Sequence, residues 1–303
     1  MPSPTDFNLS PYFDDFSESK KFHRVLFRPA FAVQARELTQ SQTILQNQVE
    51  KVSDHLFEKG AMIIPGEIGY DLNYYAVKLT SIASGVSLSS FSDIVLTGGS
   101  SGVRALVVGT DATDGTDPDT LYVKYLDSGT SKTSTAFTHG ETLSGTASLS
   151  GVDTTITCVV ATCHTGSAAE IQAGTYYING FHVEVTNQTI VLDKYTNTPS
   201  YRVGLTVTES FVTPSDDSSL NDNAAGSSNV NAPGAHRFKI LLTLAKKTLS
   251  STEDENFYEI ARVDNGAIKS MVRNTEYSIL EETLARRTFD ESGDYVLTNP
   301  EFD

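Results

Sequence analysis

Tryptophan is absent from this chain of 303 residues, and cysteine occurs only at Cys158 and Cys163. So few cysteines exclude a disulfide-stapled scaffold and suit a protein made in the cytoplasm. The two cysteines lie five residues apart and His164 follows them, as in half of a zinc site, but no second Cys/His pair lies nearby to complete four ligands. We therefore expect two half-buried strand thiols and no metal.

Long apolar runs and basic clusters are also missing. No run approaches the roughly 18 apolar residues that a membrane span needs, and residues 1–10 lack the basic and apolar regions of a signal peptide. The formal charge is −16, from 22 basic and 38 acidic residues. Nucleic acids and anionic membranes are bound chiefly by Lys and Arg, so this balance argues against both as partners. We expect the protein to stay in the cytoplasm until it is assembled into something larger.

Signatures of catalysis are missing as well. The six histidines are scattered, and the chain contains no HExxH, GxSxG, P-loop or dinucleotide-binding pattern. Asp111, Asp114, Asp117 and Asp119 could bind calcium through clustered carboxylates, but their spacing does not match an EF-hand loop. We interpret this cluster as a solvated loop and expect a protein that is not an enzyme and needs no cofactor.

One long helix is predicted from Ala35 to Lys59, because this stretch has no Gly or Pro and Gly60 stands where a C-cap glycine would. Its apolar residues recur with a heptad period, interrupted by one polar residue. The stripe consists of Ala35, Leu38, Gln42, Leu45, Val49, Val52 and Leu56. Periodicity leaves two interpretations open: a helix packed on its own domain, or a short coiled coil between copies in which the glutamine sets the register.

Strand-like segments dominate the rest of the chain, with an additional β-like stretch at 22–29 before the helix. They are punctuated by Gly, Ser, Thr, Asn and Asp, and Asn179-Gly180 is a strong signal for a two-residue hairpin turn. Expected strands cover 61–66, 74–79, 103–108, 121–126, 154–160, 174–178, 181–185, 189–192, 202–207, 237–244 and 257–263. A second helix is expected at 275–287. The fold class is therefore α+β, mostly β, with small antiparallel modules.

Composition divides the chain further. We expect an extended N-terminal arm (1–34), the helix (35–60), a β domain (61–80 and 166–213), an inserted Ser/Thr/Gly-rich β module (81–165), an exposed loop or linker (214–235), and strands plus a helix (236–303). The segment from Asp290 to Leu297 is expected to begin a further strand. We thus expect the native chain to continue, or to end in a short C-terminal part.

The segment FRPAFAVQARELTQSQTILQNQ, from Phe27 to Gln48, closely resembles a signature of tailed-phage virion proteins. That family carries a domain of unknown function and is associated with baseplates and tail fibres. The segment from Leu284 to Gly293, LARRTFDESG, also resembles its pattern. The resemblance is specific at both ends of the chain and weak through the Ser/Thr-rich middle.

This resemblance implies a virion component of the tail: a baseplate wedge protein, or an adaptor that anchors tail fibres. Its partners would be copies of itself, with a homotrimer favoured, and other baseplate or tail proteins. The chain departs from the family signature at Ala30, where Gly is common, and at Ser41, where an apolar residue is common. We expect alanine to disfavour a positive φ at position 30.

A receptor-binding tail protein is the alternative, with host-surface glycans bound by the inserted β module. Sugars stack on exposed aromatic rings, and this module offers only Phe91, Tyr122, Tyr125 and Phe137 for that purpose. The complete lack of tryptophan counts against glycan binding. A virion-bound hydrolase is a third class, but no catalytic constellation supports it.

Overall fold

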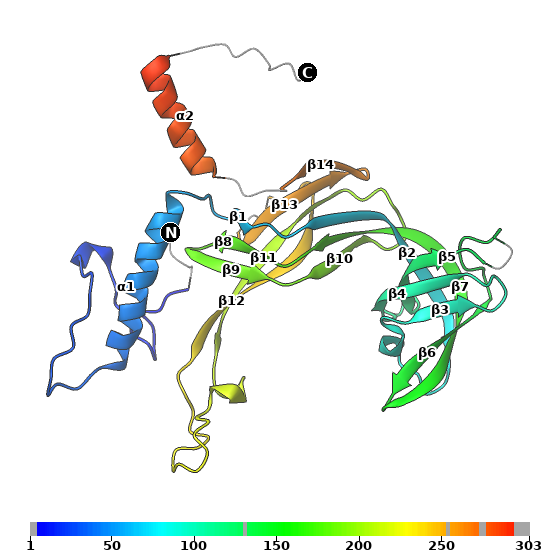
Figure 1. The fold of residues 1–303 in the computed structure, drawn as a ribbon, viewed down its shortest axis with the longest axis horizontal. Coiled ribbons are helices and arrows are strands. Elements are labelled where there is room, and N and C mark those ends of the chain that lie inside the picture. The colour runs from blue at the N-terminus through cyan, green and yellow to red at the C-terminus, as the bar shows by residue number, and fades with distance from the viewer. Residues whose placement is uncertain (1–4, 130–131, 253–254, 273–276, 294–303) are drawn as a thin grey trace.

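The computed structural model describes residues 5–129, 132–252, 255–272 and 277–293. The fold is mostly β, with three antiparallel sheets and two α-helices (Figure 1). The helices are α1 (Ala35–Asp54) and α2 (Ser278–Ser292). The strands are β1 (Met62–Ile64), β2 (Ile68–Ile82), β3 (Val95–Gly98), β4 (Arg104–Asp111), β5 (Thr120–Asp127), β6 (Thr142–Leu149), β7 (Val152–Ile171), β8 (Gly174–Ile178), β9 (Phe181–Val185), β10 (Gln188–Asp193), β11 (Tyr201–Val212), β12 (Arg237–Thr248), β13 (Phe257–Asp264) and β14 (Ala267–Met271).

A six-stranded barrel forms one end of the molecule. In the largest sheet β7, β2, β5, β4, β3 and β6 follow in order, and β6 pairs back with β7, so the strands close on themselves. Its interior is filled by fully buried side chains that include Phe91, Leu96, Leu121 and Ile156. Through this closure each barrel strand pairs with a strand on either side. The barrel residues lie within or directly beside the predicted insertion at 81–165.

A second core lies between the remaining strands. It combines β1, β8 and β9 with the four-stranded sheet β12-β11-β13-β14 and with β10. The strands predicted in 236–303 therefore do not form a unit of their own, because β12 and β13 pair with β11 on either side. The Asn179-Gly180 turn is present as predicted: both residues have positive φ, and Ile178 pairs with Phe181.

The long strands β2 and β7 connect the two cores. Ile68 and Tyr70 at the start of β2 pack against the second core, whereas Val77 and Leu79 further along the same strand lie in the barrel core. The boundary between the units thus runs through two continuous strands. The composition of the sequence could not reveal this boundary, because the residues on both sides of it belong to the same continuous strands.

The end of α1 differs from the prediction. The helix stops at Asp54, and the amides of Leu56 and Phe57 both bond to the Ser53 carbonyl, which turns the chain away. Gly60 is therefore not the C-cap. It has a φ of +88°, its N–H donates to the Tyr177 carbonyl, and a Cβ at this position would lie 2.4 Å from the Tyr258 ring.

The β-like stretch at 22–29 is not a strand. Residues 22–27 form no backbone hydrogen bond with the described part of the chain, and most of their side chains are exposed. The prediction for Ala30 is also wrong, because its φ is +64°. A strand needs a hydrogen-bonded neighbour, and no described segment pairs with residues 22–27.

The C-terminal helix is longer than expected and shifted, since α2 spans Ser278–Ser292. Asp290 belongs to it and does not begin a strand; the expected continuation from Asp294 lies outside the described residues. None of the helices in the described residues is long and apolar enough to cross a membrane.

Candidate assembly surface

Helix α1 is held against the body of the molecule by its inner faces. At its start, Gln34 and Glu37 form a reciprocal capping box, with the Gln34 N–H donating to Glu37 Oε2 at 2.8 Å. The β8–β9 turn holds the middle, because Gln46 Nε2 donates to the Gly180 carbonyl at 2.5 Å. Near its end, the Tyr177 hydroxyl donates to Asp54 Oδ1 at 2.7 Å. These contacts fix the orientation of the helix on the body.

The N-terminal arm fastens the other side of α1. Glu18 accepts a hydrogen bond from Asn47 at 2.7 Å and an ion pair from Lys51 at 3.2 Å. Further back, the Phe7 ring packs edge-on against Phe238, with centroids 5.0 Å apart. The arm therefore ties α1 to the β11–β12 hairpin.

The predicted stripe lies on the face of α1 that points away from the chain's own core. Leu38 is 52 % exposed, Leu45 68 % and Val52 63 %. Ala35, Gln42 and Val49 are exposed as well, and only Leu56 is half-buried. The helix buries a different set of residues against the body, namely Ile44, Glu50 and Ser53. The helix is therefore packed on its own domain, as one of the two interpretations has it, but the stripe takes no part in that packing among the described residues.

The stripe is also free of charge along its centre. From Leu38 to Val49 the helix carries no acidic or basic residue. Depletion of charge is a feature of interface cores. Identical copies can approach along such a surface without like charges opposing one another, even though the whole chain has a formal charge of −16.

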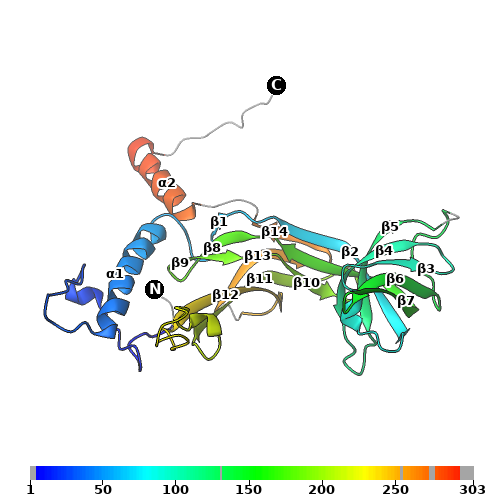
Figure 2. The same ribbon diagram turned by 60° about the horizontal axis from the view of Figure 1, so that its bottom comes forward.

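One further element at this end, helix α2, exposes apolar side chains. Helix α2 is exposed from Leu280 to Ser292, and only Ile279 is half-buried among its described side chains. Tyr277 at its start contacts Phe57, with ring centroids 5.4 Å apart, which places α2 beyond the end of α1 (Figure 2). A helix of 15 residues is only marginally stable without tertiary packing. It is therefore expected to need a neighbour.

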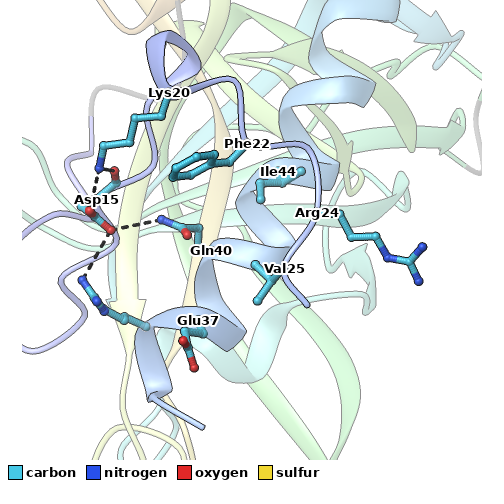
Figure 3. Close-up of a pocket in the computed structure, with 9 residues that line it drawn as sticks. Asp15, Lys20, Phe22, Arg24, Val25, Glu37, Gln40 and Ile44 are labelled. Atoms are coloured by element: carbon cyan, nitrogen blue, oxygen red, sulfur yellow. Dashed lines mark hydrogen bonds and ion pairs between the residues drawn. The ribbon is translucent and has the colours of Figure 1, made fainter. Parts of the chain in front are cut away.

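A hollow between the arm and α1 is lined mostly by charged and polar side chains. Figure 3 shows Asp15 at its wall, where the carboxylate binds Lys20 at 2.7 Å and Gln40 at 3.1 Å. The Lys20 ammonium lowers the pKa of Asp15, so this group is a poor proton acceptor. Its lining is largely charged and solvated, unlike the mostly apolar lining of ligand pockets.

The other candidates from the sequence are occupied by structural contacts. Lys194 pairs with Asp111 at 2.7 Å and Lys78 with Asp117 at 3.1 Å, so lysines sit where a cation would bind. Both cysteines lie on β7 and are free; burial raises the pKa of Cys158 to about 12, which leaves it unreactive. No cluster of metal-ligating side chains occurs among the described residues.

The aromatic residues considered for glycan stacking do not form a surface platform. Phe91 and Phe137 are buried in the barrel core, and Tyr125 is half-buried against Phe137 with ring centroids 5.3 Å apart. Tyr122 is buried outside that core, where it stacks on Tyr74 with ring centroids 5.0 Å apart. A sugar ring could not stack on the buried three. The glycan-binding alternative therefore lacks the aromatic surface on which it depended.

Comparison with known families adds one finding to this geometry. Residues 10–82 and 129–299 match the model of a family described as a domain of unknown function (DUF4815). The chain belongs to this family. No curated protein and no solved structure matches the chain. The matched ranges include α1 and α2 and leave out residues 83–128, which contain β3, β4 and β5 of the barrel.

Proposed function

We propose that this DUF4815 chain is a non-enzymatic structural protein of a tailed-phage virion, acting in the baseplate wedge or as an anchor for tail fibres. The proposal takes the virion role from the resemblance of Phe27–Gln48 and Leu284–Gly293 to tail proteins. It takes the mode of action from the outward-facing stripe on α1. The chain would assemble with copies of itself and with other tail proteins, and neither nucleic acid nor a membrane would take part.

The observation that carries the assembly role is the exposure of the stripe on a firmly held helix. A flexible exposed helix would lose conformational freedom on binding, but α1 is already ordered by the β8–β9 turn and by the arm. Burying four half-exposed side chains, Leu38, Leu45, Val49 and Val52, would contribute on the order of 1 kcal/mol each per copy. Association costs about 4–15 kcal/mol, which is similar to this gain summed over two or three copies, so the stripe alone would give weak association and other surfaces would strengthen it.

A homotrimer is the arrangement we favour. In a parallel bundle around an axis, each stripe residue meets its own copies, and Gln42 side chains can hydrogen-bond to one another in the core. A polar residue at such a position sets the register at a cost in stability. Helix α2 would extend the contact, because it begins beside the end of α1 and has Leu280 and Leu284 on one face.

Measuring the mass of the full chain in solution tests the proposal. At tens of micromolar we expect wild type to form oligomers and Leu45→Asp with Val52→Asp to be monomeric, because each Asp would bury a charge at the seam. Leu126→Asp with Val152→Asp is the matched control. These residues are 49 % and 65 % exposed but lie on the barrel, and their replacement should leave the mass unchanged.

A monomeric wild type at this concentration would contradict self-association through α1. The virion role has its own test, which is to label the chain in intact phage and locate it by electron microscopy. Density at the tail tip is expected. A position at the base of fibres would favour the anchor role over the wedge role, and absence from the virion would overturn both.

A further inference from the structure

The segment directly before α1 is unusual in both charge and exposure. Residues 20–34, here called the strap, contain four of the 22 basic residues and none of the 38 acidic ones. The strap is therefore +4, and the rest of the chain −20. Its Leu26 is 75 % exposed, and Phe22, Phe27 and Phe31 are all more than half exposed. The strap thus combines cations with apolar side chains that lack cover.

The backbone and the two arginine side chains of the strap form few contacts with the described part of the chain. Residues 22–27 form no backbone hydrogen bond within the described chain. The Arg24 guanidinium points away from α1 into solvent (Figure 3), and no ion pair or hydrogen bond of the described residues involves it. Arg28 only covers the neighbouring Phe31 ring, at 4.2 Å from its centroid. An acidic surface could therefore bind here without displacing an existing ion pair of Arg24 or Arg28.

An acidic counterpart is present on the same chain. The segment between β11 and β12, residues 213–236, is here called the hairpin tip and contains Asp216, Asp217 and Asp222 but no Lys or Arg. Asp216 and Asp217 are exposed. Their carboxylates accept hydrogen bonds from the Thr213 hydroxyl and the Ser219 N–H, so they hold fixed positions in the tip.

Within one copy the two elements cannot meet. The strap and the hairpin tip lie on opposite sides of α1 in both views of the molecule (Figures 1 and 2). In a ring of copies around a common axis, however, one flank of each subunit faces the opposite flank of the next. Such head-to-tail contacts close when the rotation between subunits is that of the ring.

We propose that the strap of one copy docks on the hairpin tip of the adjacent copy, with Arg24 and Arg28 facing Asp216 and Asp217. This inference rests on the proposed self-association through α1 and supplies an additional surface that would strengthen it. The apolar side chains of the strap would be covered at the same contact. Charge would also select the partner flank, because two hairpin tips or two straps repel one another.

The test measures the association constant of the full chain by sedimentation. One variant carries Arg24→Gln and Arg28→Gln, and another carries Asp216→Asn and Asp217→Asn, because asparagine retains the turn hydrogen bonds of aspartate. We expect each variant to associate about tenfold more weakly than wild type at low salt, as for the loss of close charge pairs. The combined variant should be no weaker than either pair of changes alone.

Controls separate this contact from general charge effects and from the stripe. Lys124→Gln with Lys132→Gln removes two exposed cations from the barrel and should leave association unchanged. If the stripe variant abolishes association but the strap variant does not weaken it, the inference is wrong and the proposed function stands. A monomeric wild type would instead contradict both the strap–tip contact and the self-association through α1.

Two other results would also overturn the inference. The losses in the strap and tip variants could multiply in the combined variant, which would mean that the two elements bind different things. Alternatively, wild type could bind vesicles containing phosphatidylserine through Arg24 and Arg28 while its mass stays the same in the strap variant. The strap would then be assigned to a membrane surface.

Discussion

In the barrel, Leu96, Leu121 and Ile156 are fully buried, whereas at the opposite end of the molecule Leu26, Leu45 and Val52 are each more than three-fifths exposed (Figure 1). The barrel strands pair with neighbours on both sides and close on themselves. At the α1 end, the strap has no backbone partner and α2 is exposed from Leu280 onward. The barrel strands thus hydrogen-bond to one another and enclose a buried core. The α1 end instead presents apolar surface of the kind that marks interaction sites.

The family match follows this division only in part. It covers the strap, α1 and α2, the second core, and the barrel strands β2, β6 and β7. Residues 83–128, which it omits, contain the barrel strands β3, β4 and β5. The exposed surfaces at the α1 end thus lie within the matched ranges, and the omitted segment lies wholly in the barrel.

The largest expected effect is a change in the free energy of unfolding, compared between a leucine-to-alanine variant in the barrel core and another on the α1 stripe. Leu121→Ala leaves a cavity in the barrel and should lower the free energy of unfolding by about 3 kcal/mol. Leu45→Ala removes an exposed side chain and should change it by less than about 0.5 kcal/mol in dilute monomer. Urea unfolding followed by circular dichroism at low protein concentration measures both. Equal losses in the two variants would mean that the stripe packs within the chain.

A middle-sized effect is expected from Glu141, whose buried carboxylate joins the turn after β3 to the segment before β6. It accepts hydrogen bonds from the Ser101 N–H at 3.0 Å, from the Ser101 hydroxyl at 2.9 Å and from the Thr138 N–H at 2.5 Å. Burial acts to raise the pKa of Glu141, but these donors outweigh it, and the pKa lies below its ordinary value of 4.5.

Glu141→Gln should therefore lower stability by about 2 kcal/mol at neutral pH, because an amide group faces donors that need an acceptor. The wild-type advantage is present above the unfolded-state pKa and is lost as pH falls below about 4.5 and through the lowered folded-state pKa. Urea unfolding at pH 7 and pH 3 tests this, with the exposed Glu184→Gln as a control of no effect. A stability difference that is the same at both pH values would show that the carboxylate charge is unimportant.

The smallest effect concerns the strap. Ala30 has a φ of +64°, a conformation that costs a non-glycine residue about 1 kcal/mol. Ala30→Gly should relieve this cost and slow hydrogen exchange at the Phe31 amide, which donates to the Arg28 carbonyl. Ala32→Gly, at a position without positive φ, should speed exchange instead by adding freedom to the unfolded segment. Faster exchange in both variants would argue that Ala30 is unstrained.

Several elements could be predicted from the residues alone. The Asn179-Gly180 turn required positive φ at two positions, and those two residues accept it at low cost. The range of α1 was correct at Ala35 but five residues too long, because the contacts of Phe57 with Tyr177 are long-range and leave no local signal. Strands β3, β6 and β14 were missed. β6 is rich in Ser, Thr and Gly, while β3 and β14 are only four and five residues long, so none of the three has a clear strand signal before a neighbouring strand pairs with it.

The candidate assembly surface shows the same limits. Six of its seven residues share the exposed face of α1, because a helix with 3.6 residues per turn brings that spacing to one side. Leu56 lies beyond the end of α1 and is half-buried. The strap and the hairpin tip were not recognised as a pair, since their charges lie about 190 residues apart in the sequence. A count of charge along the chain would have found the strap, but only the structure places the tip across α1 from it.

The sequence by itself determined which residues of α1 share a face and which segments favour extended backbone, because both follow from local backbone geometry. It also carried the resemblance from which the virion role is proposed. The tertiary structure decided that the stripe faces outward, that six strands close into a barrel, and that the strap is left without a partner. Those outcomes depend on which distant segments pack against the same surface. The β8–β9 turn and the N-terminal arm contact the inner faces of α1, and the stripe is left exposed.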